Sequence, residues 1–389
     1  MQHLFDEVID RRRTGCRKWD AAGQLFGTDD VLPMWIADMD FKSPPAVVKA
    51  IQDRAGHGVY GYPHKGEAFY TAIQSWMRRR HDWQVEKEWI LGTPGVVPAL
   101  STAILAYTRP GDKIIIQPPV YPPFFSCVIN NQRELVQNPL VFSEGRYCMD
   151  FDDLENKLDG KVKMLILCSP HNPVGRVWSR EELERLGKIC EEHDLIIVSD
   201  EIHADLVFSG HQHIPMASLS PEVAKRTITC MAASKTFNVA GLYTAIVIIS
   251  DPQLRDKFMQ VFEALDLNTG NLFGITALVA AYEQGESWLE ELLLYLNANI
   301  DYMLDFVMQQ VPEIQIARPE ATYLAWLDCR GLGLEEDKLK SFFIQQAKVG
   351  LNDGRTFGGK GYMRLNFGCP RNVLEEGLLR IARAVKYCR

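Results

Sequence analysis

Short, unbroken runs of apolar residues alternate with helical patterns between residues 89 and 250. Five such runs stand out, at 113–119, 162–170, 195–201, 227–233 and 244–250. A strand that is buried on both faces reads as a continuous apolar run, and such strands are typical of parallel sheets covered by helices. The pattern therefore predicts an α/β fold with a mostly parallel, mixed sheet between layers of helices.

The segments between these runs have the period of amphipathic helices. The clearest is SREELERLGKICEEHD at 179–194, in which Ser179 precedes the helical pattern and Glu182 follows three residues later. A serine and a glutamate at this spacing form a capping box, which satisfies free N–H groups at the start of a helix. We therefore predict that a helix begins directly after Ser179.

The pattern changes after residue 285, where regular alternation gives way to longer helices and isolated strands. A long helical pattern covers 287–310, and strand-like segments lie at 314–329 and 362–368. Further helices are predicted over 335–346 and after Pro370, a residue that is common near the first position of a helix. We predict a large α/β domain over 44–285 and a smaller α+β domain built from 1–43 and 286–389.

Composition and charge narrow the class of protein. The 389 residues are 47% hydrophobic and carry a net charge of −8, which argues against a general nucleic-acid-binding protein. No apolar run has the length of a membrane span, and the charged start MQHLFDEVIDRRR lacks the apolar core of a signal peptide. The nine cysteines are scattered without a CxxC pair, so we expect reduced thiols and a cytoplasmic protein.

A group of histidines raises the possibility of a metal site, which the spacing does not favour. His203, His211 and His213 lie within EIHADLVFSGHQHIP. Zinc sites use closer and more regular sets of cysteine and histidine. We therefore predict no metal here.

Residues that could bind a ligand or take part in a reaction directly follow the apolar runs. In open α/β sheets, ligands bind beyond the carboxyl ends of the strands. The residues in such positions are Gly95, Tyr121, Asn172, Asp200, His203 and Lys235. We expect these residues to surround one ligand site.

Lys235 and Asp200 allow two interpretations. A buried lysine or aspartate is costly without a partner, so the two residues could form an ion pair that only holds the sheet together. Asn172, the ring of Tyr121 and the N–H groups that begin the helix after Gly95 favour a ligand instead. Pyridoxal phosphate needs all of these features: an amine, a carboxylate, a donor for its hydroxyl group, a stacking surface and an anion site.

Several motifs resemble a known family across nearly the whole chain. SPHNPVG (169–175), SDEIH (199–203), SKTFNVAGL (234–242) and MRLNFGCP (363–370) resemble fold-type I pyridoxal-phosphate enzymes of the class I/II aminotransferase superfamily. WIADMDF (35–41), GVYGYP (58–63), DEIHADLV (200–207) and ATYLAWLD (321–328) resemble its MalY/PatB-type branch of cystathionine or cysteine-S-conjugate β-lyases.

The resemblance implies a role for each matching residue. Lys235 would bind the cofactor as a Schiff base and act as catalytic base. The other implied cofactor contacts are Asp200 at the ring nitrogen, Asn172 at the ring hydroxyl, Tyr121 stacked on the ring, and Val96, Val97 and Ser234 at the phosphate. Tyr62 would reach the phosphate of the neighbouring subunit's cofactor, which implies a homodimer. Arg364 and Ala37 would bind the substrate, with Arg364 holding its carboxylate rather than forming a surface ion pair.

Three positions depart from the broader superfamily. His203 stands where many relatives have tyrosine, and its alternative is a core histidine with satisfied hydrogen bonds. Tyr243 and Ala232 stand where relatives often have an arginine and a serine that bind the phosphate. Backbone amides, Ser234 and Tyr62 would have to compensate. The resemblance implies that the lyase branch shares the histidine and the lost arginine.

The predicted reaction is β-elimination of L-cystathionine or a related S-substituted L-cysteine to a thiol, pyruvate and ammonia. An aminotransferase is the first alternative, because both reactions remove the same Cα proton. A regulatory or binding protein that only keeps the fold is a second, and the presence of both Lys235 and Asp200 argues against it. The expected partners are a small amino-acid substrate and a second copy of the chain, without nucleic acid or membrane.

Overall fold

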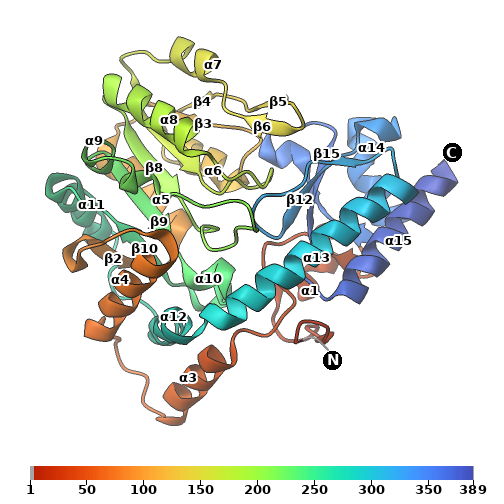
Figure 1. The fold of residues 1–389 in the computed structure, drawn as a ribbon, viewed down its shortest axis with the longest axis horizontal. Coiled ribbons are helices and arrows are strands. Elements are labelled where there is room, and N and C mark those ends of the chain that lie inside the picture. Colours follow the sequence, from red (N-terminus) through yellow and green to blue (C-terminus); the bar gives the residue numbers. More distant parts are fainter. Residues whose placement is uncertain (1–3, 389) are drawn as a thin grey trace.

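A seven-stranded sheet forms the centre of the protein in the computed structural model, which describes residues 4–388 (Figure 1). Its strands, in spatial order, are β2 (Ile90–Thr93), β10 (Ala245–Ile248), β9 (Thr227–Met231), β8 (Ile196–Asp200), β7 (Val162–Cys168), β3 (Lys113–Ile116) and β4 (Glu134–Gln137). β10 runs antiparallel to both of its neighbours, and the remaining pairs are parallel. The predicted mostly parallel, mixed sheet is confirmed.

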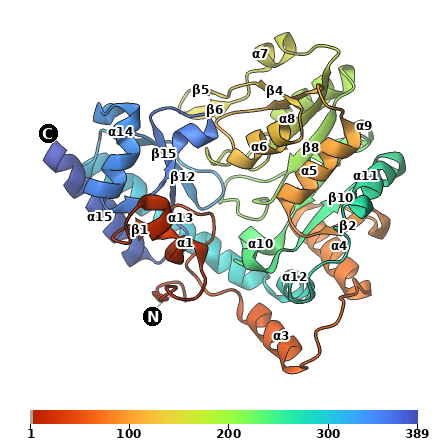
Figure 2. The same ribbon diagram turned by 180° about the vertical axis from the view of Figure 1, so that it is seen from behind.

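Helices cover both faces of this sheet, as the two views show (Figures 1 and 2). Alternate strand residues Ile114 and Ile166 pack with helices α5 (Val96–Tyr107), α6 (Pro122–Asn130) and α11 (Pro252–Ala264). Their neighbours Ile115 and Leu165 pack on the other face with α8 (Arg180–Glu192). Burial on both faces explains why these strands read as unbroken apolar runs.

A second, four-stranded sheet carries the C-terminal part of the chain. Its order is β11 (Gln315–Ile316), β12 (Leu324–Asp328), β15 (Tyr362–Asn366) and β14 (Asn352–Asp353). The long α13 (Glu286–Gln310) packs against the last helix, α15 (Arg371–Cys388). From the N-terminal part, β1 (Leu32–Pro33) pairs with β13 (Val349–Gly350). The exact domain limits at residues 44 and 285 stay a prediction.

Further elements complete the fold. α3 (Pro45–Gly56) and α4 (Glu67–His81) pack against α12 (Leu272–Gln284) at one end of the large sheet (Figure 2). The shorter elements are α1 (Arg17–Asp20), α2 (Ala22–Phe26), α7 (Phe151–Asn156), α9 (Pro221–Ala224), α10 (Ala233–Thr236), α14 (Glu336–Ser341), β5 (Val141–Ser143) and β6 (Arg146–Cys148).

Local sequence signals match the structure closely in the helices. Ser179 Oγ accepts the N–H of Glu182 at 3.2 Å, and the Glu182 carboxylate accepts the N–H of Ser179 at 2.8 Å. This capping box confirms the predicted start of α8. The helix expected over 335–346 is α14 followed by a π-helical turn over 342–346.

Two global observations bear on the class of protein. None of the helices within residues 4–388 is both long and apolar enough to cross a membrane. The eight cysteines whose side chains are described are free thiols.

Candidate active site

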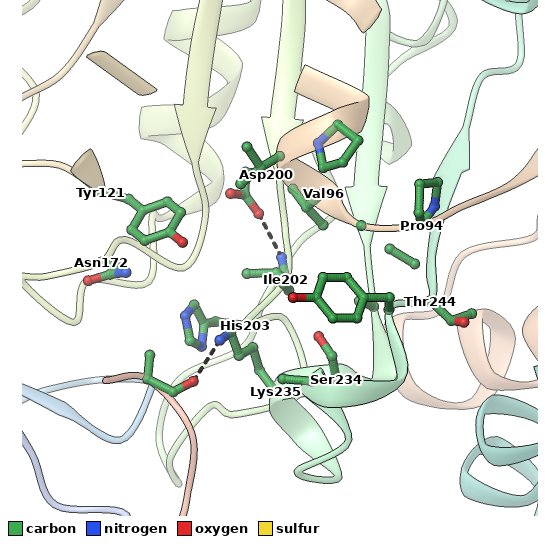
Figure 3. A pocket seen from close by; sticks show the side chains of 18 of the residues that line it. Pro94, Val96, Tyr121, Asn172, Asp200, Ile202, His203, Ser234, Lys235 and Thr244 are labelled. Carbon is green, nitrogen blue, oxygen red and sulfur yellow. Dashed lines mark hydrogen bonds between the residues drawn. The ribbon is translucent and has the colours of Figure 1, made fainter. Parts of the chain in front are cut away.

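A cavity of about 250 Å³ opens at the carboxyl ends of β7, β8 and β9 (Figure 3). Its lining includes Val96, Tyr121, Asn172, Asp200, His203 and Lys235. These residues come from five segments that are far apart in sequence. The structure therefore brings together the strand-end residues singled out in the sequence, as expected for an open α/β sheet.

Lys235 reaches this cavity from α10, the four-residue helix after β9. The sequence predicted a strand through residue 233, but β9 ends at Met231 and the backbone turns into a helix at Ala233. The ammonium group donates a hydrogen bond of 2.6 Å to the carbonyl oxygen of Ala37 (Figure 3). Burial lowers the pKa of Lys235 to about 8, although the Asp38 carboxylate opposes this shift. Such an amine is a competent nucleophile near neutral pH.

Asp200 is the last residue of β8 and is buried beside the same cavity. Its Oδ1 accepts the N–H of Ile202 at 3.2 Å. Strand pairing places Cys168 and Cys230, two weakly polar side chains, on either side of it. Burial raises the pKa of Asp200 to about 7. The carboxylate is therefore poised to bind a cationic or proton-donating group of a ligand.

In the described part of the chain, Lys235 and Asp200 do not form the ion pair that the first interpretation requires. The Lys235 ammonium binds the Ala37 carbonyl instead, and Asp200 binds a backbone N–H group. The two side chains face the same cavity without satisfying each other (Figure 3). This arrangement favours the alternative interpretation, in which a ligand binds both.

Arg364 lies on β15 and is buried, so the alternative of a surface ion pair is wrong. Its Nη1 donates to Asn172 Oδ1 at 3.0 Å, and its Nη2 donates to the Trp35 carbonyl and to Asn352 Oδ1, both at 2.8 Å. All three acceptors are neutral, and Nε has no partner within the described chain. Burial lowers the pKa of Arg364 to about 10. A buried guanidinium group without a counter-ion favours binding of an anion such as a carboxylate.

The start of α5 provides backbone donors at the cavity. Val96 and Val97 are its first two residues and line the cavity. Pro98 has no N–H group, and the N–H of Ala99 already donates to the Gly95 carbonyl at 3.2 Å. The free donors of this first turn are thus the two predicted amides. An anion is stabilised at such a helix N-terminus.

The surroundings of this turn are neutral. Ser234 and Tyr243 also line the cavity, and Lys235 is the only lysine or arginine among the lining residues that the structure describes. The position at which the family resemblance implied a phosphate-binding arginine carries the phenol group of Tyr243. An anion bound here relies on hydrogen bonds rather than on a second cation.

His203 is buried and lines the cavity. Its ring lies edge-on to Tyr323, with ring centroids 5.9 Å apart. Burial lowers the pKa of His203 to about 3, so the imidazole is neutral at physiological pH. Its Nδ1 has no hydrogen-bond partner within residues 4–388. His203 is thus not the satisfied core histidine of the alternative interpretation.

The other histidines near His203 in sequence lie elsewhere. His213 is hydrogen-bonded through Nε2 to Glu201 Oε2 at 2.8 Å, and His211 is exposed. Within the described part of the chain, no group of three or more histidine, cysteine or acidic side chains has the arrangement of a metal site.

Two predicted site residues, Arg364 and Tyr62, are outside the cavity lining. Arg364 is hydrogen-bonded to the lining residue Asn172, whereas Tyr62 lies apart from the cavity. The Tyr62 side chain is 95% exposed, and it borders a separate surface depression with Tyr60 and Phe273. Within one chain, Tyr62 does not contact the site. Its predicted role across a subunit interface stays a prediction.

Several lining residues were missed in the sequence. Cys168, Ile202 and Thr244 line the cavity, and the Tyr323 hydroxyl donates to the Ala37 carbonyl at 3.0 Å. Cys168 and Ile202 had a usable signal, because each lies at the end of an apolar run. Tyr323 had none, because its position depends on how β12 approaches the large sheet.

The cavity fits pyridoxal phosphate, the cofactor predicted from the sequence. Lys235 offers a buried amine, Asp200 a carboxylate without a cation, and Tyr121 an aromatic ring at the wall. The two free N–H groups of α5 suit a phosphate group. Ala37 lines the same cavity, as the substrate role predicted for it requires.

Comparisons with known proteins agree with this site. Residues 29–381 match the family model for aminotransferase class I and II. The chain is 45% identical to cystathionine beta-lyase PatB of Bacillus subtilis, over 98% of this chain and 99% of that protein. A PLP-bound putative aminotransferase from Clostridium difficile superposes with a TM-score of 0.97 at 46% identity, covering 98% of this chain and all of the other. Cystalysin from Treponema denticola, which contains pyridoxal 5'-phosphate, superposes with a TM-score of 0.97 at 35% identity, covering all of both chains.

Proposed function

The chain belongs to the aminotransferase class I and II family, and from this premise we propose that it is a pyridoxal-phosphate-dependent carbon–sulfur β-lyase. Its substrate is L-cystathionine or a related S-substituted L-cysteine. The observation that carries the proposal is the buried Lys235 amine, which faces the same cavity as the unpaired carboxylate of Asp200. The 45% identity to a cystathionine beta-lyase over the full chain supports the choice of reaction.

The chain's own residues bind and orient the substrate and the cofactor. Arg364 holds the substrate carboxylate with a planar guanidinium group that has only neutral partners in the protein. Val96, Val97 and Ser234 would hold the cofactor phosphate, and Tyr121 would pack on its ring. Asn172 would bind the ring hydroxyl group and also accepts a hydrogen bond from Nη1 of Arg364, so it would couple the orientation of cofactor and substrate.

Lys235 and Asp200 control the protons of the reaction. The Lys235 amine takes the proton from the substrate Cα, for which a pKa of about 8 is well suited. Asp200 holds a proton at the cofactor's ring nitrogen. Pyridoxal phosphate would supply the electron sink that makes the Cα proton removable. Loss of the thiol from Cβ then leaves a product that hydrolyses to pyruvate and ammonia.

The assembly and location are part of the same proposal. We propose a homodimer in which Tyr62 reaches the cofactor phosphate of the partner subunit, because its side chain is almost fully exposed in the single chain. A cytoplasmic location is favoured by the free thiols, which persist in reducing compartments.

The deciding experiment measures pyruvate released from L-cystathionine by the purified protein with pyridoxal phosphate and no keto acid. We expect sustained release, because β-elimination needs no amino-group acceptor. Lys235→Ala removes the amine and is expected to abolish both turnover and the yellow colour of the bound cofactor, whereas Lys49→Ala on exposed α3 leaves both unchanged. Amino transfer to 2-oxoglutarate in place of pyruvate release would contradict the lyase and establish an aminotransferase.

A further inference from the structure

The backbone carbonyl of Ala37 is the acceptor for the Lys235 ammonium group, at 2.6 Å. Ala37 lies in the segment 35–41, which we call the strap because it crosses the site between the two sheets. The same oxygen accepts the Tyr323 hydroxyl at 3.0 Å. Two buried donors therefore converge on one main-chain oxygen, and their positions depend on how firmly the strap is held.

Charged side chains from the N-terminal segment hold the strap on the far side of Ala37. The Lys18 ammonium is 1% exposed and donates to Asp40 Oδ2 at 2.6 Å. Arg11 bridges the two strap carboxylates, donating to Asp40 Oδ1 at 2.6 Å and to Asp38 Oδ2 at 2.7 Å. Burial alone would raise the pKa of Asp40, but Lys18 and Arg11 hold it below its usual value. The Asp40 carboxylate is therefore charged and paired at physiological pH.

Amide side chains fix the strap backbone around the same oxygen. Asn366 Nδ2 donates to the carbonyls of Ile36 and Asp38, both at 2.6 Å, so it holds the residues on either side of Ala37. Asn238 donates to the carbonyls of Met39 and Phe41 at 2.9 and 2.8 Å. The Ala37 carbonyl is thus the centre of a segment that is bound on both flanks.

The buried ion pairs need an explanation other than stability. Replacing a buried ion pair by apolar side chains is often neutral or stabilising, so such a pair is weak support for a fold. What charged pairs with fixed geometry provide is a defined position for the backbone that carries them. In this chain, the backbone held in this way carries the Ala37 carbonyl oxygen, which contacts the Lys235 amine.

We propose that Lys18 and Arg11 are positioning residues of the active site, whose ion pairs with Asp40 and Asp38 hold the Ala37 carbonyl against the Lys235 ammonium. The expected effect of these residues on turnover rests on the proposed function. Whenever the Lys235 amine is free, the carbonyl binds it and retains the proton on Nζ. The other titratable groups that face this amine are Asp38, Asp200, His203 and Arg364.

The test measures the pH midpoint of Lys235 in the full-length chain after removal of the cofactor. Trace acetylation with acetic anhydride at a series of pH values, read by mass spectrometry at Lys235, reports the fraction of free amine. In Lys18→Met we expect the midpoint to fall by about one pH unit, because the ammonium loses a well-placed acceptor. Lys49→Met removes an exposed ion pair with Asp53 on α3 and is expected to leave the midpoint unchanged.

The direction in which the Lys235 midpoint shifts distinguishes a positioning role of Lys18 from a direct effect of its charge. Removing the Lys18 charge without moving the strap leaves the nearby carboxylates less compensated, which would raise the Lys235 midpoint or leave it unchanged. Either result in a folded Lys18→Met protein overturns the proposal.

A double variant separates positioning from a loss of stability. Lys18→Met/Asp40→Asn removes both charges of the pair, and we expect it to recover thermal stability while keeping the lowered midpoint. A midpoint restored to that of the unmodified chain overturns the proposal. If Lys18→Met does not fold, Arg11→Gln, at a partly exposed position, provides the same measurement. Because acetylation requires no turnover, failure of the pyruvate assay and failure of this test are distinguishable.

Discussion

At the scale of single residues, burial of the Asp200 carboxylate lowers the stability of the folded chain but prepares this group to bind a ligand. Its pKa is raised from 3.8 to about 7 by burial. The folded chain therefore binds a proton that the unfolded chain releases between about pH 4 and pH 7, and this contribution to stability is lost as the pH rises through that range. Above pH 7 the protein without cofactor holds an ionised, buried carboxylate with no cation.

Asp200→Asn tests this cost. The amide cannot ionise, so we expect the free energy of unfolding of the cofactor-free chain to increase relative to the unmodified chain as pH rises. The gain at pH 8 should exceed the gain at pH 5 by about 3 kcal/mol, because the linkage acts over the two pH units between pH 5 and the folded pKa of about 7. Urea unfolding at the two pH values measures it. The same variant should bind pyridoxal phosphate more weakly.

The control for this measurement is Asp152→Asn, because the Asp152 side chain is 92% exposed. Its effect should be small and nearly equal at pH 5 and pH 8. A gain in Asp200→Asn that is also equal at both pH values would contradict a raised pKa at Asp200.

The residues of the site differ in how far the sequence could predict them. Asp200, Asn172 and Lys235 each follow an apolar strand, so position alone indicated a shared edge of the sheet. Ala37 came only from family resemblance, because its contact with Lys235 joins segments 198 residues apart. The lack of a cation beside Asp200 was not predictable from the sequence, because it depends on which way the Lys235 side chain turns.

At the scale of elements, the first turn of α5 is the proposed phosphate site, and it is made of backbone groups. Its two free donors are the N–H groups of Val96 and Val97, because Pro98 has none and that of Ala99 is already bonded. Proline is tolerated at the first position of a helix, and the preceding Gly95 has the extended backbone that proline favours. Val96→Pro therefore removes one donor with little change in the helix.

We expect Val96→Pro to weaken binding of pyridoxal phosphate by about tenfold or more relative to Val96→Ala. Val96→Ala shortens the side chain but keeps the N–H group, whereas Val96→Pro keeps a side chain of similar size and loses the N–H group, so a larger loss in Val96→Pro is assigned to the N–H group. Titration of the cofactor-free chain by absorbance gives both dissociation constants. Pyridoxal, which lacks the phosphate, serves as the control ligand. An equal loss of affinity for both ligands would place the phosphate elsewhere.

Element types were more predictable than their limits. The apolar runs gave the strands because burial on both faces removes polar positions, and the capping box gave the start of α8. The antiparallel direction of β10 was not readable, since an apolar run looks the same in either direction. The turn into α10 was also missed, because the apolar run continues through Ala232 and Ala233, although alanine favours a helix over a strand.

At the scale of the whole molecule, the site depends on segments from every part of the chain. The large sheet provides Asp200, the helix α10 that follows β9 provides Lys235, β15 provides Arg364, and the strap provides Ala37. Arg364 of β15 donates a hydrogen bond to Asn172, in the loop after β7, at 3.0 Å, so the two parts of the protein meet through residues of the proposed site. A change in the relative position of the two sheets would therefore alter substrate binding and cofactor contacts together.

The proposed homodimer extends this dependence to a second chain, because Tyr62 is exposed and lies outside its own cavity. Tyr62→Phe should lower cofactor affinity if its hydroxyl group binds the partner's phosphate. Co-refolding Tyr62→Phe with the inactive Lys235→Ala chain tests the geometry, since a mixed dimer would then contain one site with both native residues. With random pairing, about a quarter of all sites would be fully native, and activity at limiting pyridoxal phosphate should rise above that of either variant alone. If Tyr62 served its own subunit, no mixed dimer would contain a native site and mixing would restore nothing.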